Sequence, residues 1–454
     1  MNINMTLEKD IDLGSIFNQL YPICRSITGP GIRESLEILA EHMPLHIEAV
    51  PSGSKVLDWT VPEEWELISA RLIGPDGEVV VDTSHSNLHV LNFSEPFTGE
   101  MELDELQGHL YSVDELPNAI PYVTSYYVPR WGFCLSKEKR DTLQPGKYKV
   151  EINTKKYPGE LNYAWAELQG ESEEVVLVTS YLCHPSMANN ELSGPLGLLR
   201  VYHELEKIKK RRFTYRFLLI PETIGSITYL AKNGEELSPK LFSGLVLTCL
   251  GGPGKRLSFK MSRRDWIGEP SPIDTLARHL ADFQSDDFAV RDFTPTGGSD
   301  ERQFCSPGFN LPMAQAARTI YGDYAAYHTS LDDLQFMTIE AVERSASLIA
   351  ATLQAMECCS VRFRNKQPFG EPQLGRRNLY PSINGPMTNQ FSTDIAKDGR
   401  RALDNLLCVL SLADGERTLL EIAEHIDRSV LELVPIVRHL EKESMMERMT
   451  EENK

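Results

Sequence analysis

The sequence predicts an α/β protein built on a mostly parallel sheet with helices on both faces. Apolar runs typical of buried strands alternate with helix-like segments through the middle of the chain, from a run at 175–179 to a long helix at 337–356. This β–α–β–α order is typical of parallel strands joined by crossover helices. Alternating apolar and polar residues at 56–154 predict a small inserted all-β domain, and helix signals near the end predict a C-terminal winged-helix domain.

The composition indicates a soluble globular protein that binds neither membranes nor nucleic acid. The 454 residues carry a formal net charge of −19, whereas a general nucleic-acid binder needs a basic face. No apolar run is long enough to span a bilayer, and the polar start lacks the apolar centre of a signal peptide. The eight cysteines form no CxxC pair, which favours reduced thiols. We therefore expect a cytoplasmic location.

The first elements are helices at 14–50, so the insertion divides the expected α/β domain into 1–55 and 155–362. A turn-rich loop between these helices carries Arg25, which either faces the active site or caps a helix. Within the insertion, an aromatic run at 121–134 is either a lid over a substrate pocket or part of the insertion's own core. We expect the core, because large aromatic side chains are mostly buried.

Three more strands of the α/β domain are expected at 215–220, 244–250 and 310–313. A helix with one apolar face at 198–208 lies between the first strand and the second. In open α/β sheets, ligands bind at the loops that follow the carboxyl ends of the strands. The residues directly after these strands are therefore the candidates for a functional site.

The C-terminal part predicts a linker or irregular wrap at 363–400 and a winged-helix domain at 401–454. Two of its helices start with capping-box pairs: Thr418 with Glu421, and Ser429 with Glu432. Acidic residues outnumber basic ones in this part of the chain, which is the wrong sign for a helix that reads DNA. We therefore expect protein contact through this domain, including homo-oligomerisation.

Four polar stretches fall at carboxyl ends of the expected strands: 184–191, 221–226, 250–254 and 327–332. A doubly wound sheet brings such loops to one edge, where they would assemble two histidines and at least two carboxylates. Imidazole and carboxylate groups are the ligands of hydrolytic zinc sites. The alternative is that each histidine is a loop side chain whose hydrogen bonds are satisfied by the backbone.

Motifs in these stretches resemble the zinc aminopeptidase family typified by bacterial leucyl aminopeptidase and glutamate carboxypeptidase. The motifs are CHPSMANNELSG, PETIGS, GSDERQFCSPGFNLP and YHTSLDDL. They resemble most closely a bacterial aminopeptidase-like branch, whose members carry a β-rich insertion before the catalytic strands and a winged-helix tail. The resemblance covers about residues 18–445.

The resemblance implies metal ligands position by position. His184 matches the first zinc histidine of the family, and His328 matches the last one, in the same HTS context. Asn190 occupies the position of the carboxylate that bridges two zinc ions. Because a neutral amide cannot bridge two dications, we expect one zinc ion per chain. We expect Asp332 to orient His328 without binding the metal itself. We expect Asn190 also to lie around the ligands without binding the metal.

Two glutamates are candidates for the third ligand. Glu191 lies beside the bridging position, and we expect it to complete the zinc site with His184 and His328, leaving one position open to water. Glu222 matches the ligand glutamate of the family's Glu-Glu pair, whose general base is replaced here by Pro221. We expect Glu222 to act as the general base on that water. The alternative exchanges the roles of the two glutamates.

Residues near the same edge are candidates for substrate binding. Asp300 and Glu301 offer carboxylates to a free amino group, and Arg302 offers a partner to a carboxylate or an oxyanion. The alternative for this loop is a capped turn with an internal ion pair. Tyr327 either donates a hydrogen bond to a developing oxyanion or packs beside His328.

The sequence thus predicts a zinc-dependent hydrolase of a peptide-like amide bond. We expect an aminopeptidase or an amidase dedicated to one pathway, with a small peptide or amide as substrate. The alternative is a non-catalytic binding or scaffold protein on a degenerate peptidase fold. The missing bridging aspartate and the missing general base favour that alternative.

Overall fold

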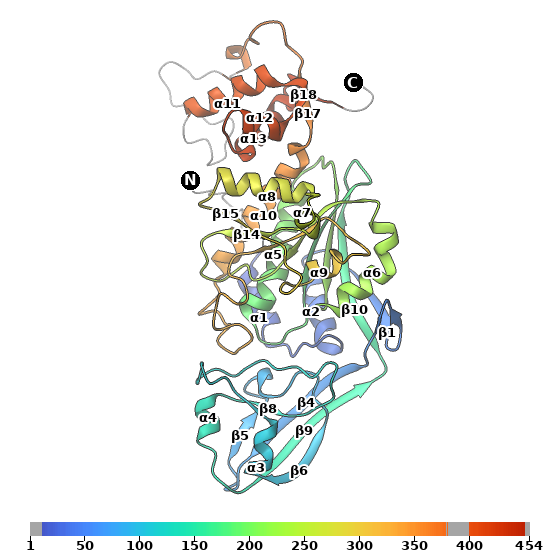
Figure 1. The fold of residues 1–454 in the computed structure, drawn as a ribbon, viewed down its shortest axis with the longest axis vertical. Coiled ribbons are helices and arrows are strands. Elements are labelled where there is room, and N and C mark those ends of the chain that lie inside the picture. Colours follow the sequence, from blue (N-terminus) through green and yellow to red (C-terminus); the bar gives the residue numbers. More distant parts are fainter. Residues whose placement is uncertain (1–10, 378, 380–398, 450–454) are drawn as a thin grey trace.

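The computed structural model describes residues 11–377, 379 and 399–449. It consists of three parts arranged along the long axis of the molecule (Figure 1): a β-rich part at one end, a central α/β part and a C-terminal helical part. Within the described residues, no helix is both long and apolar enough to cross a membrane. The predicted fold class is confirmed.

An eight-stranded sheet forms the centre of the α/β part, in the order β1-β10-β12-β11-β13-β16-β14-β15. Its four middle strands run parallel, whereas β1, β10 and the β14–β15 pair join them through antiparallel neighbours. The strands are β1 (His46–Pro51), β10 (Glu160–Leu168), β11 (Val175–Tyr181), β12 (Thr214–Ile220), β13 (Leu241–Leu247), β14 (Leu257–Lys260), β15 (Phe288–Arg291) and β16 (Met313–Ala317).

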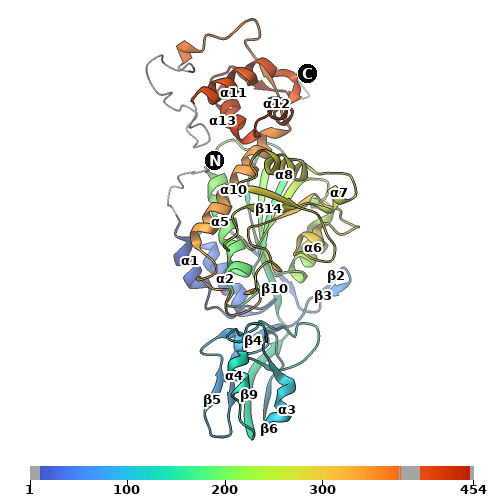
Figure 2. The same cartoon turned by 60° about the vertical axis from the view of Figure 1, so that its left-hand side comes forward.

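Helices cover both faces of this sheet. Figure 2 shows α1, α5 and α10 on one side, and α6 and α7 on the other. The helices are α1 (Leu13–Leu20), α2 (Pro30–Ala40), α5 (Ser193–Glu206), α6 (Ile224–Leu237), α7 (Arg263–Trp266), α8 (Pro272–Phe283), α9 (Glu301–Phe304) and α10 (Ile339–Cys359). All seven residues of β11 are buried, as the uninterrupted apolar run in its sequence predicts for a strand covered on both faces.

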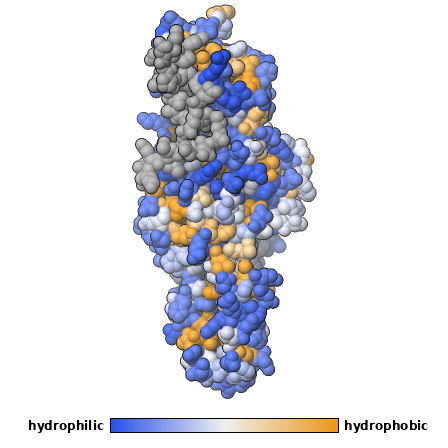
Figure 3. All heavy atoms as spheres, turned by 90° about the vertical axis from the view of Figure 1, so that its left-hand side faces the viewer, coloured by the Kyte–Doolittle hydropathy of each residue, from blue (hydrophilic) through white to orange (hydrophobic). Residues whose placement is uncertain are grey.

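The insertion folds as a separate four-stranded antiparallel sheet in the order β5-β4-β9-β6. Its strands are β4 (Glu64–Ile73), β5 (Val79–Asp82), β6 (Phe97–Glu102) and β9 (Lys147–Tyr157). They enclose a small hydrophobic core of their own. Strand β9 is followed after two residues by β10 of the central sheet, so consecutive strands that belong to different sheets link the two parts. Figure 3 shows the insertion as a narrower arm below the α/β part.

The C-terminal part contains three helices and a three-stranded sheet in the order β18-β17-β19. The elements are β17 (Arg362–Asn365), α11 (Gly399–Leu412), β18 (Asp414–Thr418), α12 (Leu419–His425), α13 (Val430–Lys442) and β19 (Met446–Arg448). The segment expected as a linker therefore supplies the central strand of this sheet. Residues 378 and 380–398 of that segment lie outside the described residues.

Only one of the two expected capping boxes forms. The hydroxyl of Thr418 accepts a hydrogen bond from the backbone N–H of Glu421, whose carboxylate accepts one from the N–H of Thr418. The carboxylate of Glu432 instead accepts hydrogen bonds from Nε and Nη2 of Arg401, each at 2.7 Å. Ser429 still caps its helix, because its hydroxyl accepts from the N–H of Leu431. A bidentate ion pair thus displaces the second box.

The C-terminal part is docked on the α/β part through α13. Apolar residues of α13 and α10 belong to one hydrophobic cluster, and α13 is buried on most of its surface. At the start of α13, the backbone N–H of Val430 donates to Nε2 of His279 on α8, at 2.9 Å. Because the start of the equivalent helix reads DNA in helix–turn–helix proteins, this docking covers the end that would enter a groove.

The environment of His279 predicts that acid weakens the contact between the C-terminal part and the α/β part. Its Nε2 accepts a hydrogen bond, so the ring must be neutral. Burial lowers the pKa of His279, although Glu424 opposes this change. The unfolded chain takes up the proton below about pH 6.5 while the folded chain resists it, so stability is lost as the pH falls. Between about pH 7.5 and 5.5 we expect the free energy of unfolding to fall by up to about 1.4 kcal/mol per pH unit for this one histidine. Urea unfolding at several pH values measures this loss.

The control for this prediction is His279→Gln, whose side-chain oxygen can accept the same hydrogen bond but does not titrate. The variant should lose less stability than the wild-type protein over the same pH interval. Equal losses would show that His279 does not couple protonation to docking.

Candidate functional site

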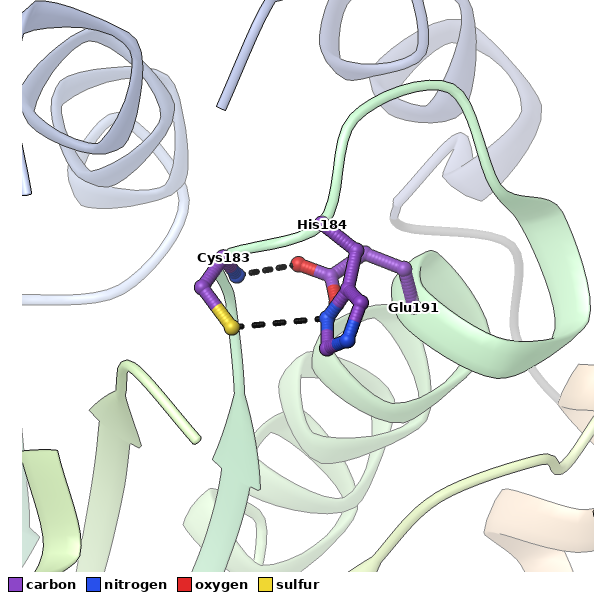
Figure 4. Close-up of side chains that lie close together, drawn as sticks. All are labelled: Cys183, His184 and Glu191. Carbon is purple, nitrogen blue, oxygen red and sulfur yellow. Dashed lines mark hydrogen bonds and ion pairs between the residues drawn. The ribbon is translucent and has the colours of Figure 1, made fainter. Parts of the chain in front are cut away.

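His184 lies on the loop that follows β11 at the carboxyl edge of the central sheet. Its Nδ1 lies 2.7 Å from Oε2 of Glu191 (Figure 4), and the backbone N–H of Cys183 donates to Oε1 of Glu191, at 2.5 Å. Glu191 belongs to a short π-helical segment, η3 (Ala188–Leu192), which leads directly into α5. Both oxygens of Glu191 are thus held by the loop that carries His184. This contact fixes the ring and leaves Nε2 as the nitrogen that faces away from Glu191.

Arg25 is fully buried behind this pair, at 0 % exposure. Its Nε donates to the backbone oxygen of His184, at 3.0 Å, and lies 3.7 Å from Oε1 of Glu191. Its Nη1 donates to the backbone oxygen of Leu20, at 2.6 Å. Arg25 therefore supports the site from behind and also binds the last carbonyl of α1, so each of its two expected roles is met in part. Its charge compensates that of the buried Glu191 carboxylate.

His328 lies opposite His184, with 5.4 Å between the ring centroids. Its backbone has a positive φ of 54°, which is uncommon outside glycine and recurs at functional sites. Its Nε2 is buried without a hydrogen-bond partner. Burial lowers the pKa of His328 to about 3, and the neighbouring His184 contributes to this decrease. The ring is therefore a neutral imidazole with an unpaired buried nitrogen.

Glu222 follows β12 and lies on the same side as the histidine rings. Its Oε2 is 3.7 Å from Nε2 of His184, and its Oε1 accepts a hydrogen bond from the hydroxyl of Ser299, at 2.6 Å. The next residue, Thr223, has a positive φ of 63° at the start of α6. Burial raises the pKa of Glu222, which His184 and Ser299 oppose. One oxygen of Glu222 thus lies near Nε2 of His184.

A cavity of ≈ 420 Å³ opens beside these side chains. The α/β part contributes Ile27, Cys183, His184, Glu222, Thr223 and His328 to its lining. The insertion contributes Tyr122, Val123, Thr124, Tyr126, Tyr127 and Arg130. The expectation that the aromatic run forms the insertion's core holds for its end, where Phe133 is fully buried. The same expectation is wrong for the tyrosines. They line the cavity, in agreement with the alternative that the aromatic run forms a lid over a pocket.

The insertion is fixed to the loop of His328 by backbone contacts. The N–H of Tyr122 donates to the backbone oxygen of His328, at 2.7 Å, and Pro121 forms an antiparallel bridge with Thr329. The ring of Tyr122 lies 5.1 Å from the ring of His184 and 5.2 Å from that of His328. A residue from the insertion therefore packs against both histidines.

The loop at 299–302 supports the site from outside the cavity. Oδ1 of Asp300 accepts from the N–H of Thr223 and the hydroxyl of Ser226, at 2.8 and 2.7 Å. Burial and the charge of Glu222 raise the pKa of Asp300 to about 8. Glu301 forms a buried ion pair with Lys260, at 2.8 Å, as the alternative for this loop predicted. Neither carboxylate lines the cavity, and neither does Arg302.

Three further expected residues also lie outside the cavity lining. The ring of Tyr327 stacks on His328, with 3.8 Å between centroids. Asp332 was expected to orient His328 but accepts hydrogen bonds from the N–H groups of Asn189 and Asn190, at 2.6 and 2.9 Å. The side-chain nitrogen of Asn190 donates to the hydroxyl of Tyr181, at 2.9 Å. Asp332 thus anchors the start of the π-helical segment that carries Glu191.

Three residues of the cavity lining carry side chains of the kind that bind zinc: His184, His328 and Glu222. The unpaired buried nitrogen of His328 fits a metal ligand, because a buried polar atom otherwise costs free energy. Cys183, His184 and Glu191 also lie within 4.8 Å of one another. Their nearest atoms already bond to each other, and burial raises the pKa of the Cys183 thiol to about 11. His184, His328 and Glu222, which line the cavity, therefore stay candidate metal ligands beside this more compact group.

Comparison with known proteins places this site in a family. A family model described as "Domain of unknown function (DUF4910)" matches residues 15–358. The chain belongs to this family. A second model, described as a winged helix-turn-helix, matches residues 361–448 of this DUF4910 protein, which include β17.

The DUF4910 protein is 40% identical over 413 residues to a Clostridium acetobutylicum protein named "Putative polysaccharide biosynthesis protein with aminopeptidase-like domain". The match covers 90% of this chain and 91% of that protein. A crystal structure described as a "putative peptidase" from the same species matches with a TM-score of 0.83 and 36% identity, over 96% of each chain. The expected membership of the aminopeptidase-like branch is confirmed.

Two more distant structures share the fold. A zinc aminopeptidase from Bacillus subtilis matches with a TM-score of 0.55 and 14% identity, over 75% of the DUF4910 protein and 93% of that chain. An M28 peptidase precursor from Shewanella amazonensis matches with a TM-score of 0.53 and 14% identity, over 76% and 92% of the two chains. At this identity the likeness shows the α/β fold and not the activity.

Proposed function

We propose that this protein is a zinc-dependent hydrolase of an amide bond. The observation that carries the proposal is the convergence of His184, His328 and Glu222 on one cavity, with Nε2 of His328 buried and unpaired. These three side chains would hold a single zinc ion. The zinc aminopeptidases that share the fold support the choice of metal and of reaction class.

The proposal makes Glu222 a metal ligand instead of the general base and gives Glu191 an orienting role that neither alternative assigned to it. Glu191 is held by His184 and by the N–H of Cys183, so it orients the first ligand rather than binding metal itself. Glu222 keeps one oxygen near Nε2 of His184, while Ser299 holds the other. Zinc, when bound, supplies Lewis acidity that polarises a carbonyl group.

The chain's own residues would position the substrate and stabilise developing charge. The hydroxyl groups of Tyr122 and Tyr126 lie 2.5 Å apart, so one donates to the other and the second keeps its proton. Burial raises the pKa of both tyrosines well above the usual value, which keeps them neutral hydrogen-bond donors. The free hydroxyl proton is available to an oxyanion that forms in the cavity.

Metal analysis tests the proposal directly. Protein purified without chelators should contain about one zinc ion per chain and should hydrolyse a small N-acyl amide. Chelation should stop hydrolysis, and added zinc should restore it. Absence of zinc together with no uptake of added zinc would refute the proposal.

A binding protein on the same fold is the second candidate. Glu222 is the only carboxylate among the described residues that line the cavity, and Pro221 stands where the resemblance to the zinc aminopeptidases implies a general base. Zinc binding at the expected ratio without turnover of any amide would favour this candidate. The docked position of α13 favours an internal packing role for the C-terminal part over DNA binding.

A further inference from the structure

The tyrosines of the insertion form one side of the cavity, here called the tyrosine wall (Tyr122, Tyr126 and Tyr127). Tyr127 is 55% exposed and packs edge-on against Trp59, at 5.2 Å. The neighbouring Val128 is 68% exposed. Exposed apolar surface at the rim of a cavity is typical of a place where a flat or apolar group binds.

Arg130 places a positive charge at the same side of the cavity. It is the only lysine or arginine among the described residues of the lining. Its Nη2 donates to the backbone oxygen of Thr124, at 2.5 Å, and its guanidinium lies 5.8 Å from the ring centroid of Tyr111. These contacts hold the guanidinium near the rim while the side chain stays exposed. A guanidinium in a fixed position favours binding of a carboxylate.

Among the described residues of the cavity lining, no carboxylate other than Glu222 can bind a free amino group. Asp300 and Glu301, expected to bind one, are buried outside the lining and bonded to Thr223, Ser226 and Lys260. Glu222, the lining carboxylate, is used as a metal ligand in the proposed function. A protonated α-amino group would therefore meet Arg130 without a dedicated anion to compensate it.

We propose that the substrate is an N-acylated amide that carries a carboxylate. Its apolar part would pack on the tyrosine wall, and its carboxylate would bind Arg130. A single carboxylate fits better than a phosphate dianion, because one arginine supplies one charge and the chain carries a net charge of −19. In the reaction, water adds across the amide: the acyl carbon gains a hydroxyl group, the C–N bond breaks, and the nitrogen leaves with a proton. The inference rests on the proposed function.

Three matched compounds test it with zinc-loaded protein. N-acetyl-L-phenylalanine is acylated and anionic, N-acetylphenethylamine is acylated and neutral, and L-phenylalanine amide has a free amino group. We expect kcat/KM to be highest for the first compound, by about tenfold or more over the second, because a hydrogen bond to a charged group is lost in the second. The compound with a free amino group should be the poorest substrate.

Arg130→Ala should raise KM for N-acetyl-L-phenylalanine about tenfold, with little change in kcat and no change for the neutral compound. Arg130→Lys should recover part of the loss. The control is Arg71→Ala, which removes another half-exposed arginine from the insertion, where it pairs with Asp82.

Preference for L-phenylalanine amide, or an Arg130→Ala variant with unchanged KM, would overturn the inference and leave the proposed function intact. If zinc-loaded protein hydrolyses none of the compounds, the proposed hydrolase function fails. Calorimetric binding of N-acetyl-L-phenylalanine then decides the inference separately. Binding that weakens about tenfold in Arg130→Ala supports it, and binding that is absent or unchanged overturns it.

Discussion

Replacing His328 with alanine should abolish tight zinc binding, whereas replacing His203 with alanine should leave it unchanged. His328 lines the cavity and has a buried, unpaired Nε2, and removal of a ligand leaves two donors where a protein zinc site needs at least three. His203 lies on α5, where its Nδ1 is 3.5 Å from Glu206, so it controls for the loss of any histidine. Competition with a chromophoric chelator measures both affinities.

Substitution of the two glutamates distinguishes the proposed zinc ligands, which include Glu222, from the expected ones, which include Glu191. Glu191→Gln should weaken zinc binding by about 10- to 100-fold, as is typical when a group that orients a metal ligand is changed. Glu222→Gln should weaken it further, because a carboxylate ligand is lost. Circular dichroism should first show that each variant is folded. A larger loss in Glu191→Gln than in Glu222→Gln would return Glu191 to the ligand position.

The sequence predicts the meeting of His184, Glu222 and His328 for a physical reason. His184 and Glu222 directly follow β11 and β12, two neighbouring parallel strands, and the carboxyl ends of such strands lie at one edge. His328 follows β16 at a greater distance, and its place there rests on the motif rather than on strand order. The general position of the site could therefore be read from the chain.

The assignment of individual side chains could not be read in the same way. Glu191 is adjacent to the residue at the bridging position, but the π-helical turn that contains it directs its carboxylate to His184. Asp332 lies near His328 in the chain yet bonds the backbone of Asn189 and Asn190. No regular spacing of residues in the sequence predicts such contacts between loops.

The tyrosines of the wall were expected in the insertion's core, with a lid over a pocket as the alternative, for a related reason. Pro121 and Thr329 form a β-bridge between loops that are about two hundred residues apart in the chain. No pattern within the sequence of the insertion predicts that pairing. Ser299 was missed as a partner of Glu222, although it belongs to the GSDERQFCSPGFNLP motif. A serine hydroxyl is too common in turns to point to a specific partner.

Replacing Arg25 with alanine should destabilise the protein more than most single substitutions. Arg25 and Glu191 are both fully buried, and Nε of Arg25 lies 3.7 Å from Oε1 of Glu191. Burial lowers the pKa of Arg25, and Glu191 opposes that change by stabilising the positive charge. Removal of the guanidinium leaves a buried carboxylate without its cation, which costs about 3–5 kcal/mol of unfolding free energy. Urea unfolding followed by circular dichroism measures this loss.

The combined variant Arg25→Ala/Glu191→Gln shows whether the loss comes from the unpaired charge. Because it removes both charges, it should be more stable than the sum of the two single changes predicts, with a coupling of about 0.5–3 kcal/mol. Arg278→Ala is the control, since Arg278 is half-exposed and its ion pair with Asp265 is at the surface side of α8; its effect should be small. Strictly additive losses would mean that Arg25 stabilises the protein through packing and its bonds to Leu20 and His184, and not through the charge of Glu191.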